Sequence, residues 1–278
     1  MDIIGFLYKS NDYLDINAIF TTLFGVLKLY VPDTLYKYYS LTNNKELNQN
    51  KLDTLQHNQI YLASHSQLND PHDGKGYYYR TDTIRKYERL KHWDDGIIAD
   101  SLQNCRIASF TANGIYSMPM WGNYANNHQG YCISYDTRDE RNMFLYSCIF
   151  PVQYVEKKID ITVLMNEFVG KLISKRNYSE EVGEKRVVIN DFRLPAALAL
   201  LENVKHVSWS YENEYRFSNM KNEKYITAVP SAIYIGRDCI EENEKRIIEI
   251  ATTNGIPVYK MENDDSSIEF WMKANRIG

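Results

Sequence analysis

The alternation of apolar and polar residues along the chain predicts strands interrupted by helical segments. Short runs rich in β-branched and aromatic residues indicate strands, and apolar residues at helical spacing indicate amphipathic helices. Strands are expected at residues 35–40, 59–64, 106–111, 130–135, 148–155, 214–218, 232–235 and 257–261. Helices are expected at residues 16–29, 83–103, 161–175, 194–206 and 241–253, with a further short helix around 120–125.

The order of these elements favours an α+β fold with a mixed, mainly antiparallel central sheet and helical insertions. Strands come in runs separated by long helical stretches, which disfavours a doubly wound parallel sheet. Because no repeat or Pro-rich linker divides the chain, we expect one domain at residues 35–278. Residues 1–34 are expected to form a helical extension. Its apolar stripe covers the domain or, alternatively, makes a homodimer contact.

Composition narrows the classes of partner. The 278-residue chain has a net charge of −4, which argues against electrostatic binding of nucleic-acid phosphates by this chain alone. Its 23 tyrosines are either amphipathic strand residues or stacking surfaces for a planar ligand. The four cysteines lack C-x-x-C spacing and are expected to be buried thiols in a reducing compartment. The apolar stretch at residues 18–31 is too short to span a bilayer, so a cytoplasmic protein without a membrane segment is expected.

The segment Trp209-Ser210-Tyr211-Glu212-Asn213-Glu214-Tyr215-Arg216-Phe217 carries the most informative polar motif. Residues two apart on a strand share a face, so Glu212 and Glu214 are expected to face one pocket, with Tyr215 and Phe217 in the core. We expect Arg216 to point away from the two carboxylates and Lys205 to supply their cation. The alternative is a pair of solvated acids on an exposed strand.

Two further motifs combine aromatic and polar residues. Trp121, Tyr124 and His128 follow one another at helical spacing, which indicates either a core stripe or one side of a site. Because Gln129-Gly130 ends the helix, His128 is expected at the rim, titrating near neutrality. In Tyr36-Lys37-Tyr38, the lysine is expected on the strand face opposite the two tyrosines.

The segment Asn69-Asp70-Pro71-His72-Asp73-Gly74 is dense in turn formers and predicts a loop. Its oxygen donors suggest a metal site, but the spacing of an EF-hand is absent. We therefore expect Asn69 and Asp70 to cap backbone N–H groups. Walker, G-x-G-x-x-G, G-x-S-x-G and H-E-x-x-H motifs are also absent, which disfavours those enzyme classes.

Four motifs follow one another along the chain: Leu35-Tyr36-Lys37-Tyr38; Ile60-Tyr61-Leu62-Ala63-Ser64 with the loop at 69–74; Met120-Trp121-x-x-Tyr124-Ala125-x-x-His128-x-Gly130; and Lys205-x-x-x-Trp209-x-x-Glu212-x-Glu214-x-Arg216. Taken in this order, they resemble the bacterial family called domain of unknown function 2971. The resemblance covers roughly residues 35–236 and implies bacterial or phage-encoded cytoplasmic proteins, some of them near defence and toxin genes.

The Glu212-x-Glu214 element also resembles the E-x-E element of mono-ADP-ribosyltransferases. This resemblance implies an ADP-ribosyltransferase-like fold and NAD as the substrate. By this resemblance Glu214 bonds a ribose hydroxyl and stabilises an oxocarbenium-like transition state. Glu212 orients or deprotonates the acceptor, while Tyr38 or Tyr124 stacks on nicotinamide. Lys37 or Tyr38 stands at the early-strand polar position, and Ser64-His65-Ser66 at the Ser-Thr-Ser element.

These observations predict an NAD-consuming transferase or glycohydrolase that acts as a toxin or antiphage effector, with a protein or nucleic acid as a candidate acceptor. The alternatives are a non-enzymatic module that senses a nucleotide or phage component, and a nuclease with magnesium on Asp70, Asp73, Glu212 and Glu214. The expected catalytic residues are Glu214, Glu212 and Tyr124. The expected ligand-binding residues are Lys37, Tyr38, Ser64, Asn69, Asp70, Trp121 and His128, gathered around one dinucleotide-sized cleft.

Overall fold

The computed structural model describes residues 22, 25–92, 105–181, 200–219 and 222–278. The chain forms two compact units, each described here by itself. Unit 1 comprises residues 1–28, 68–104 and 153–207, and unit 2 comprises residues 29–67, 105–152 and 208–278. The single domain expected at residues 35–278 stays a prediction.

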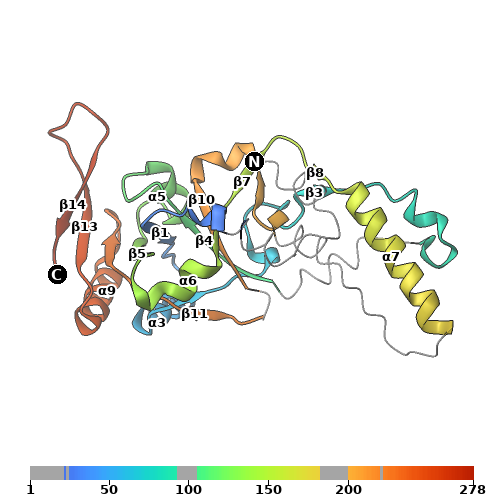
Figure 1. Cartoon of the computed structure of the whole chain (residues 1–278). Coiled ribbons are helices and arrows are strands. Elements are labelled where there is room, and N and C mark those ends of the chain that lie inside the picture. The colour runs from blue at the N-terminus through green and yellow to red at the C-terminus, as the bar shows by residue number, and fades with distance from the viewer. Residues whose placement is uncertain (1–21, 23–24, 93–104, 182–199, 220–221) are drawn as a thin grey trace. The chain divides into compact units, whose positions relative to one another are not determined.

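Unit 2 is built on an eight-stranded sheet in the order β14-β13-β12-β5-β1-β4-β10-β6 (Figure 1). The β12–β13 pair is parallel and the other pairs are antiparallel, which confirms the predicted α+β class. The strands are β1 (Thr34–Tyr39), β4 (Arg106–Thr111), β5 (Tyr131–Asp136), β6 (Ile149–Pro151), β10 (Glu214–Asn219), β12 (Ala232–Ile235), β13 (Val258–Asn263) and β14 (Met272–Arg276). A separate pair joins β2 (Gln59–Tyr61) to β11 (Tyr225–Thr227).

Three helices cover one face of this sheet, because their apolar residues belong to the same core as the strand residues of that face. They are α3 (Lys45–Gln56), α6 (Met143–Cys148) and α9 (Glu241–Asn254). Leu52 and Leu55 of α3 and Ile247 of α9 are buried with Leu35 and Phe217 of the strands. Local signals fix the helix ends: the Asn44 side chain accepts a hydrogen bond from Leu47 N at 3.0 Å, and Gly255 ends α9 with a left-handed φ of 67°.

The opposite face of the sheet carries α5 (Met118–Tyr124) and is called the α5 face below. Its strand residues alternate with those of the main core, as a pleated sheet requires. Tyr38, Cys132 and Met261 are buried there against Met120 and Trp121 of α5. Short 3-10 helices complete unit 2: η1 (His65–Gln67), η4 (Glu140–Asn142) and η5 (Val207–Glu212), of which only Val207 belongs to unit 1.

Unit 1 has its own core around α7 (Thr162–Glu181), labelled in Figure 1. Leu164, Met165 and Val169 of this helix are buried with Ile84 and Val204. Two parallel pairs join β3 (Tyr77–Tyr78) to β8 (Ile159–Asp160), and β7 (Gln153–Val155) to β9 (Val204–His206). The 3-10 helices η2 (Ile84–Lys86) and η3 (Glu88–Leu90) complete the described part of unit 1.

Several predicted elements need correction. The helix expected at 194–206 is wrong at its end, because residues 204–206 form β9. The strand expected at 148–155 is two strands, β6 and β7, with different partners. In place of the first part of a helix at 83–103, the described residues form η2 and η3.

β14 was not expected, because its sequence MKANR lacks an apolar run. The helix expected at 16–29, with its dimer contact, falls mostly outside the described residues.

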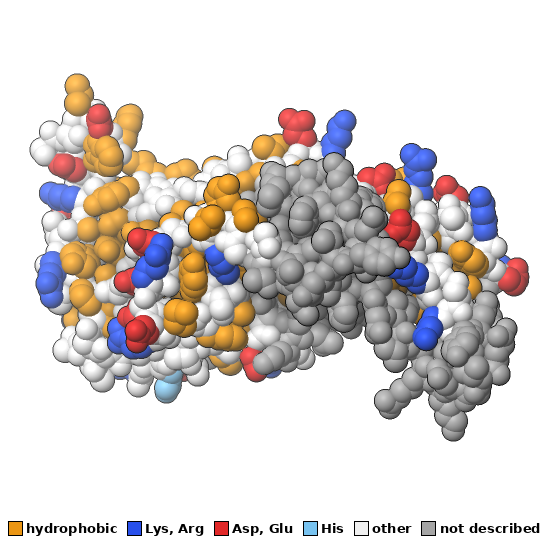
Figure 2. All heavy atoms as spheres, viewed as in Figure 1, with side chains coloured by type: hydrophobic (Ala, Val, Ile, Leu, Met, Phe, Trp, Pro, Cys, Tyr) orange, Lys and Arg blue, Asp and Glu red, His pale blue; other side chains and the backbone are white. Residues whose placement is uncertain are grey.

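Figure 2 shows hydrophobic side chains over the end of unit 2 that carries β13 and β14. Between these strands, Ile268 and Phe270 are 103% and 95% exposed. All four cysteines are described, and none forms a disulfide; Cys105, Cys132 and Cys239 are buried. Among the described residues, no helix is both long enough and apolar enough to cross a bilayer.

Candidate functional site

Three side chains of the α5 face lie in one row across neighbouring strands. Tyr36 of β1 pairs with Thr111 of β4, and Thr111 pairs with Glu214 of β10. Residues paired in this way point to the same face of a sheet. The sheet therefore brings an early tyrosine and a late carboxylate to the two sides of a buried threonine hydroxyl.

Glu214 is held by a buried ion pair with Arg216. Arg216 Nε donates to Glu214 Oε1 at 2.8 Å and Nη2 to Oε2 at 3.2 Å. The Glu214 side chain is 4% exposed and the Arg216 side chain is 1% exposed. The expectation that Arg216 points away from Glu214 is wrong, because residues 214 and 216 are two apart on β10 and share a face. Lys205, the cation expected instead, belongs to unit 1.

Glu212 lies at the end of η5, directly before β10, and is buried. Tyr124 Oη, from the last residue of α5, donates a hydrogen bond to Glu212 Oε1. Thr111 Oγ1 donates to the backbone oxygen of Glu212 at 2.6 Å. The left-handed φ of 45° at Asn213 separates the two acids, so Glu212 precedes the regular strand. The structure thus joins residues 111, 124 and 212 in one hydrogen-bonded group.

A polar rim lies beside this group. Asn113 Nδ2 donates to Tyr211 O at 2.6 Å, and Asn113 N donates to Thr111 Oγ1 at 3.0 Å. Asn123 Nδ2 lies 3.5 Å from the Tyr211 hydroxyl. Since Asn123, Asn113 and Tyr211 are all at least partly exposed, this rim connects the buried acids to the surface.

Tyr38 and Trp121 form an aromatic contact under α5. Their ring centroids are 5.0 Å apart at 85°, and Tyr38 Oη donates to Gly114 O at 2.7 Å. Trp121 Nε1 donates to Ile115 O at 2.7 Å. Both rings are almost fully buried, so Trp121 is a core residue that holds α5, and with it Tyr124, against the sheet.

His128 follows α5 in an unusual turn. Asn126, Asn127 and His128 have φ angles of 50°, 52° and 66°. The His128 ring stacks on Trp121 with centroids 5.9 Å apart. Burial, and next the charge of Arg237, lower the pKa of His128 below its ordinary value, while Asp238 acts in the opposite direction. His128 is partly exposed, as a rim position requires, and is held by stacking on the tryptophan.

Lys37 lies on the opposite face of β1 from Tyr36 and Tyr38, as predicted. Its ammonium lies 5.6 Å from the Tyr39 ring centroid and 5.5 Å from that of Phe110, and it donates to Ser109 O at 3.0 Å. Burial lowers the pKa of Lys37 to about 8, against a smaller opposing effect of Glu214. Lys37 is therefore placed against the main core, while Tyr38 and Glu214 occupy the α5 face.

Ser64 lies far from the acidic pair along β4. Its neighbour Ala63 bridges to Ile107, whereas Glu214 pairs with Thr111. Four residues of strand separate these points, which is about 13 Å. Ser64 bonds Ser66 and Gln67 locally and so forms a turn around η1.

Asn69 and Asp70 belong to unit 1. Asp70 Oδ1 accepts a hydrogen bond from His72 N at 2.8 Å, which is the backbone-capping role predicted for it. That this loop borders the cleft of the acidic pair, and that Asp70 and Asp73 share magnesium with Glu212 and Glu214, stay predictions.

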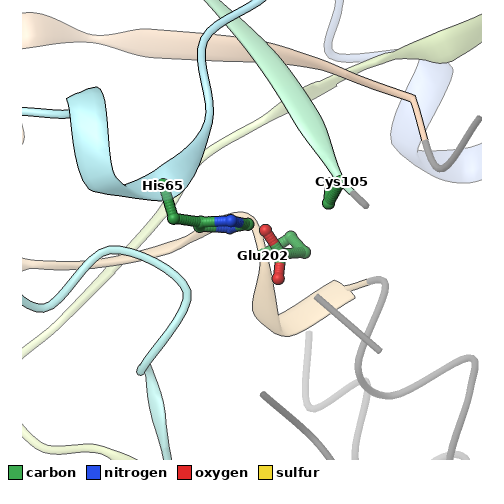
Figure 3. Close-up of side chains that lie close together, drawn as sticks. All are labelled: His65, Cys105 and Glu202. Atoms are coloured by element: carbon green, nitrogen blue, oxygen red, sulfur yellow. The ribbon is translucent and has the colours of Figure 1, made fainter. Parts of the chain in front are cut away.

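Figure 3 draws Glu202 of unit 1 together with His65 and Cys105 of unit 2. Histidine, cysteine and glutamate are all common zinc ligands. Because these side chains come from both units, we assign no metal site to them.

Sequence reasoning missed Thr111 and Asn113. Thr111 closes a predicted strand and Asn113-Gly114 follows as a turn, but nothing local ties them to residue 212. The contact of Arg216 with Glu214 could have been predicted from the sequence, because residues two apart on a strand share a face.

The fold and this group of residues define an α+β protein with a buried acid–tyrosine site. Residues 120–217 match the model of a family described as protein of unknown function (DUF2971). The match runs from α5 into β10 and includes Trp121, Tyr124, Glu212 and Glu214, which confirms the family resemblance predicted from the motifs. No curated protein and no solved structure matches the chain.

Proposed function

We propose that unit 2 cleaves the bond between nicotinamide and ribose in NAD and passes the ADP-ribosyl group to water or to a protein or nucleic-acid acceptor. The observation that carries the proposal is the hydrogen bond from Tyr124 to the buried Glu212, beside the row of Thr111 and Glu214. The predicted role as a toxin or antiphage effector is part of the same proposal and rests on the resemblance.

The chemistry suits a site with carboxylates. When the C1′–N bond breaks, both electrons go to the pyridinium nitrogen, so neutral nicotinamide leaves without a general acid. Positive charge develops on the ribose, and in this proposal the carboxylate of Glu212 stabilises it. With water as the acceptor, the attacking oxygen bonds C1′ and releases one proton, which gives ADP-ribose, nicotinamide and a proton.

In this proposal Glu212 is the base and Tyr124 relays the proton. Tyr124 is only partly buried, so its hydroxyl connects the buried carboxylate with the side from which an acceptor approaches. Glu214, to which the resemblance gives the transition-state role, is neutralised by the bidentate ion pair with Arg216. Its role here is to position β10 and, with it, Glu212.

The Glu214–Arg216 ion pair also favours the second candidate, a non-enzymatic nucleotide-binding module, because both oxygens of the Glu214 carboxylate accept hydrogen bonds from Arg216. A buried ion pair of this kind fixes the geometry of a binding site and need not take part in a reaction. The two candidates differ in one observable, because a binding module holds NAD without releasing nicotinamide.

The test is to incubate the full chain with NAD and quantify free nicotinamide by chromatography. We expect release by the wild type and a 10- to 100-fold slower release by Tyr124→Phe, which keeps the ring and removes the hydroxyl. Tyr225→Phe is the matched control, since Tyr225 is an exposed tyrosine on the separate β2–β11 pair, and it should keep the wild-type rate. NAD binding without any nicotinamide release would reject the enzyme in favour of the binding module.

A further inference from the structure

Three tyrosines form a half-exposed strip on the α5 face of the sheet. Tyr36 lies on β1, Tyr234 on β12 and Tyr259 on β13, and all three are partly buried. Tyr234 and Tyr259 are paired in register, and their rings are stacked with centroids 5.2 Å apart at 19°. We call these three residues the tyrosine strip.

The strip is rigidly held and still accessible. Tyr36 and Tyr234 pack against buried residues of the α5 face, among them Tyr38 and Met261, and are themselves only partly buried. Desolvation raises the pKa of both hydroxyls, so they stay protonated at neutral pH and can donate. Rings fixed on one side and open on the other are suited to stacking on a planar ligand.

A cation stands at one end of the strip. Arg276 of β14 is paired with Tyr259 and shares its face. Its side chain is exposed, its Nε donates to Gly278 O at 3.1 Å, and no carboxylate of the described residues forms an ion pair with it. Among the strand residues of β12, β13 and β14 on this face, Arg276 alone carries a charge. A guanidinium in this position suits a phosphate.

The other end of the strip lies nearer the acidic pair. Tyr36 pairs with Thr111, which pairs with Glu214, so Tyr36 is two strand spacings, about 10 Å, from Glu214. Tyr234 is four spacings, about 19 Å, from the strand that carries Glu214. By the same spacing Arg276, on β14, is six spacings, about 29 Å, from that strand, so the strip and its arginine form a surface separate from the acidic pair.

We infer that the tyrosine strip binds an adenine mononucleotide, with the purine extending the Tyr234–Tyr259 stack and the phosphate at Arg276. Purines offer a large ring for stacking, and one cation matches a single phosphate group. A chain of net charge −4, with a single charged residue on this face of β12, β13 and β14, is poorly suited to a polynucleotide. Because Arg276 is too far from Glu214 for one NAD molecule to contact both, the assignment is independent of the proposed function.

Adenosine monophosphate is the probe, because it lacks the bond to be broken and reports binding alone. Calorimetric titration of the full chain should give measurable binding, and Tyr234→Leu or Tyr259→Leu should weaken it roughly 5- to 150-fold. Arg276→Met should weaken adenosine monophosphate but leave adenosine unchanged. Tyr225→Leu is the matched control, since Tyr225 is an exposed tyrosine in a ring pair with Tyr61 on the β2–β11 sheet.

Absent binding by the wild type, or equal affinities for wild type and both leucine variants, would overturn the inference. Tighter binding of a single-stranded oligonucleotide than of its nucleotides would replace the mononucleotide by a nucleic acid. Adenosine monophosphate binding without nicotinamide release upholds the strip and rejects the proposed function. Nicotinamide release at a rate that Tyr259→Leu does not alter, without adenosine monophosphate binding, rejects the strip alone.

Discussion

Removing the Glu214–Arg216 ion pair one partner at a time should reveal how strongly β10 is held. Arg216→Met keeps an apolar stem of similar length and removes the two hydrogen bonds at 2.8 and 3.2 Å. Glu214→Gln keeps the volume and removes the negative charge. The double variant removes both charges together, so the three variants and the wild type form a double-mutant cycle.

The expected free energies follow from burial. Arg216 is 1% exposed and Glu214 is 4% exposed, so water solvates neither charge and the ion pair stabilises both. Removing one partner of such a pair lowers the free energy of unfolding by about 3–5 kcal/mol. The double variant leaves neither charge behind, so its loss should fall short of the sum of the single losses by roughly 2–3 kcal/mol. Arg246→Met, at the exposed pair with Glu249, should lower it by less than about 1 kcal/mol.

Urea unfolding followed by tryptophan fluorescence measures these values. Trp121, Trp209 and Trp271 all belong to unit 2, so the signal reports mainly on the unit that holds the pair. Additive single effects, or a loss in Arg216→Met no larger than in Arg246→Met, would refute the reasoning.

Three further predictions concern one lysine and two glycines. The lowered pKa of Lys37, about 8 against 10.5 when unfolded, means that the unfolded chain binds more protons between these values. Wild-type free energy of unfolding should therefore rise by about 1–3 kcal/mol from pH 8 to 10.5 relative to Lys37→Met, measured in urea; equal pH slopes would contradict it. A Cβ on Gly130 would lie 1.9 Å from Tyr39 O, so Gly130→Ala should lower stability by about 3 kcal/mol. Gly122 lies on α5 with open space around a Cβ, so Gly122→Ala should raise the free energy of unfolding by about 0.5–1 kcal/mol. Thermal melts in which Gly122→Ala and Gly130→Ala shift the melting temperature in the same direction would contradict this pair of predictions.

Much of the sheet could be predicted because its strands alternate between two covered faces. Residues 106–111 and 232–235 form strands over the ranges expected. Their buried residues follow from apolar, β-branched and aromatic patterning alone. Lys37 was likewise placed on the correct face of β1 by the two-residue period of a strand.

What could not be predicted depends on distant partners. β14 has mostly polar residues and forms because it pairs with β13. Residues 204–206 form a strand by pairing with β7, which overrides a helical pattern.

The site shows the same division. The two glutamates were found by their spacing, yet their different partners, Tyr124 and Arg216, follow from the left-handed Asn213 between them and from the position of α5. Thr111 joins the group only because β4 lies beside β10. Tyrosine-rich composition allowed either wet strand residues or a stacking surface, and the strand order then aligned Tyr234 with Tyr259.

The central claim is that Glu212 performs the chemistry while Glu214 holds the strand. The most direct measurement is nicotinamide release from NAD by Glu212→Gln, which retains an oxygen to accept the Tyr124 hydrogen bond. The account predicts a rate at least about 100-fold below that of the wild type, with an unchanged midpoint of urea unfolding. Wild-type release rates in a correctly folded Glu212→Gln would contradict it.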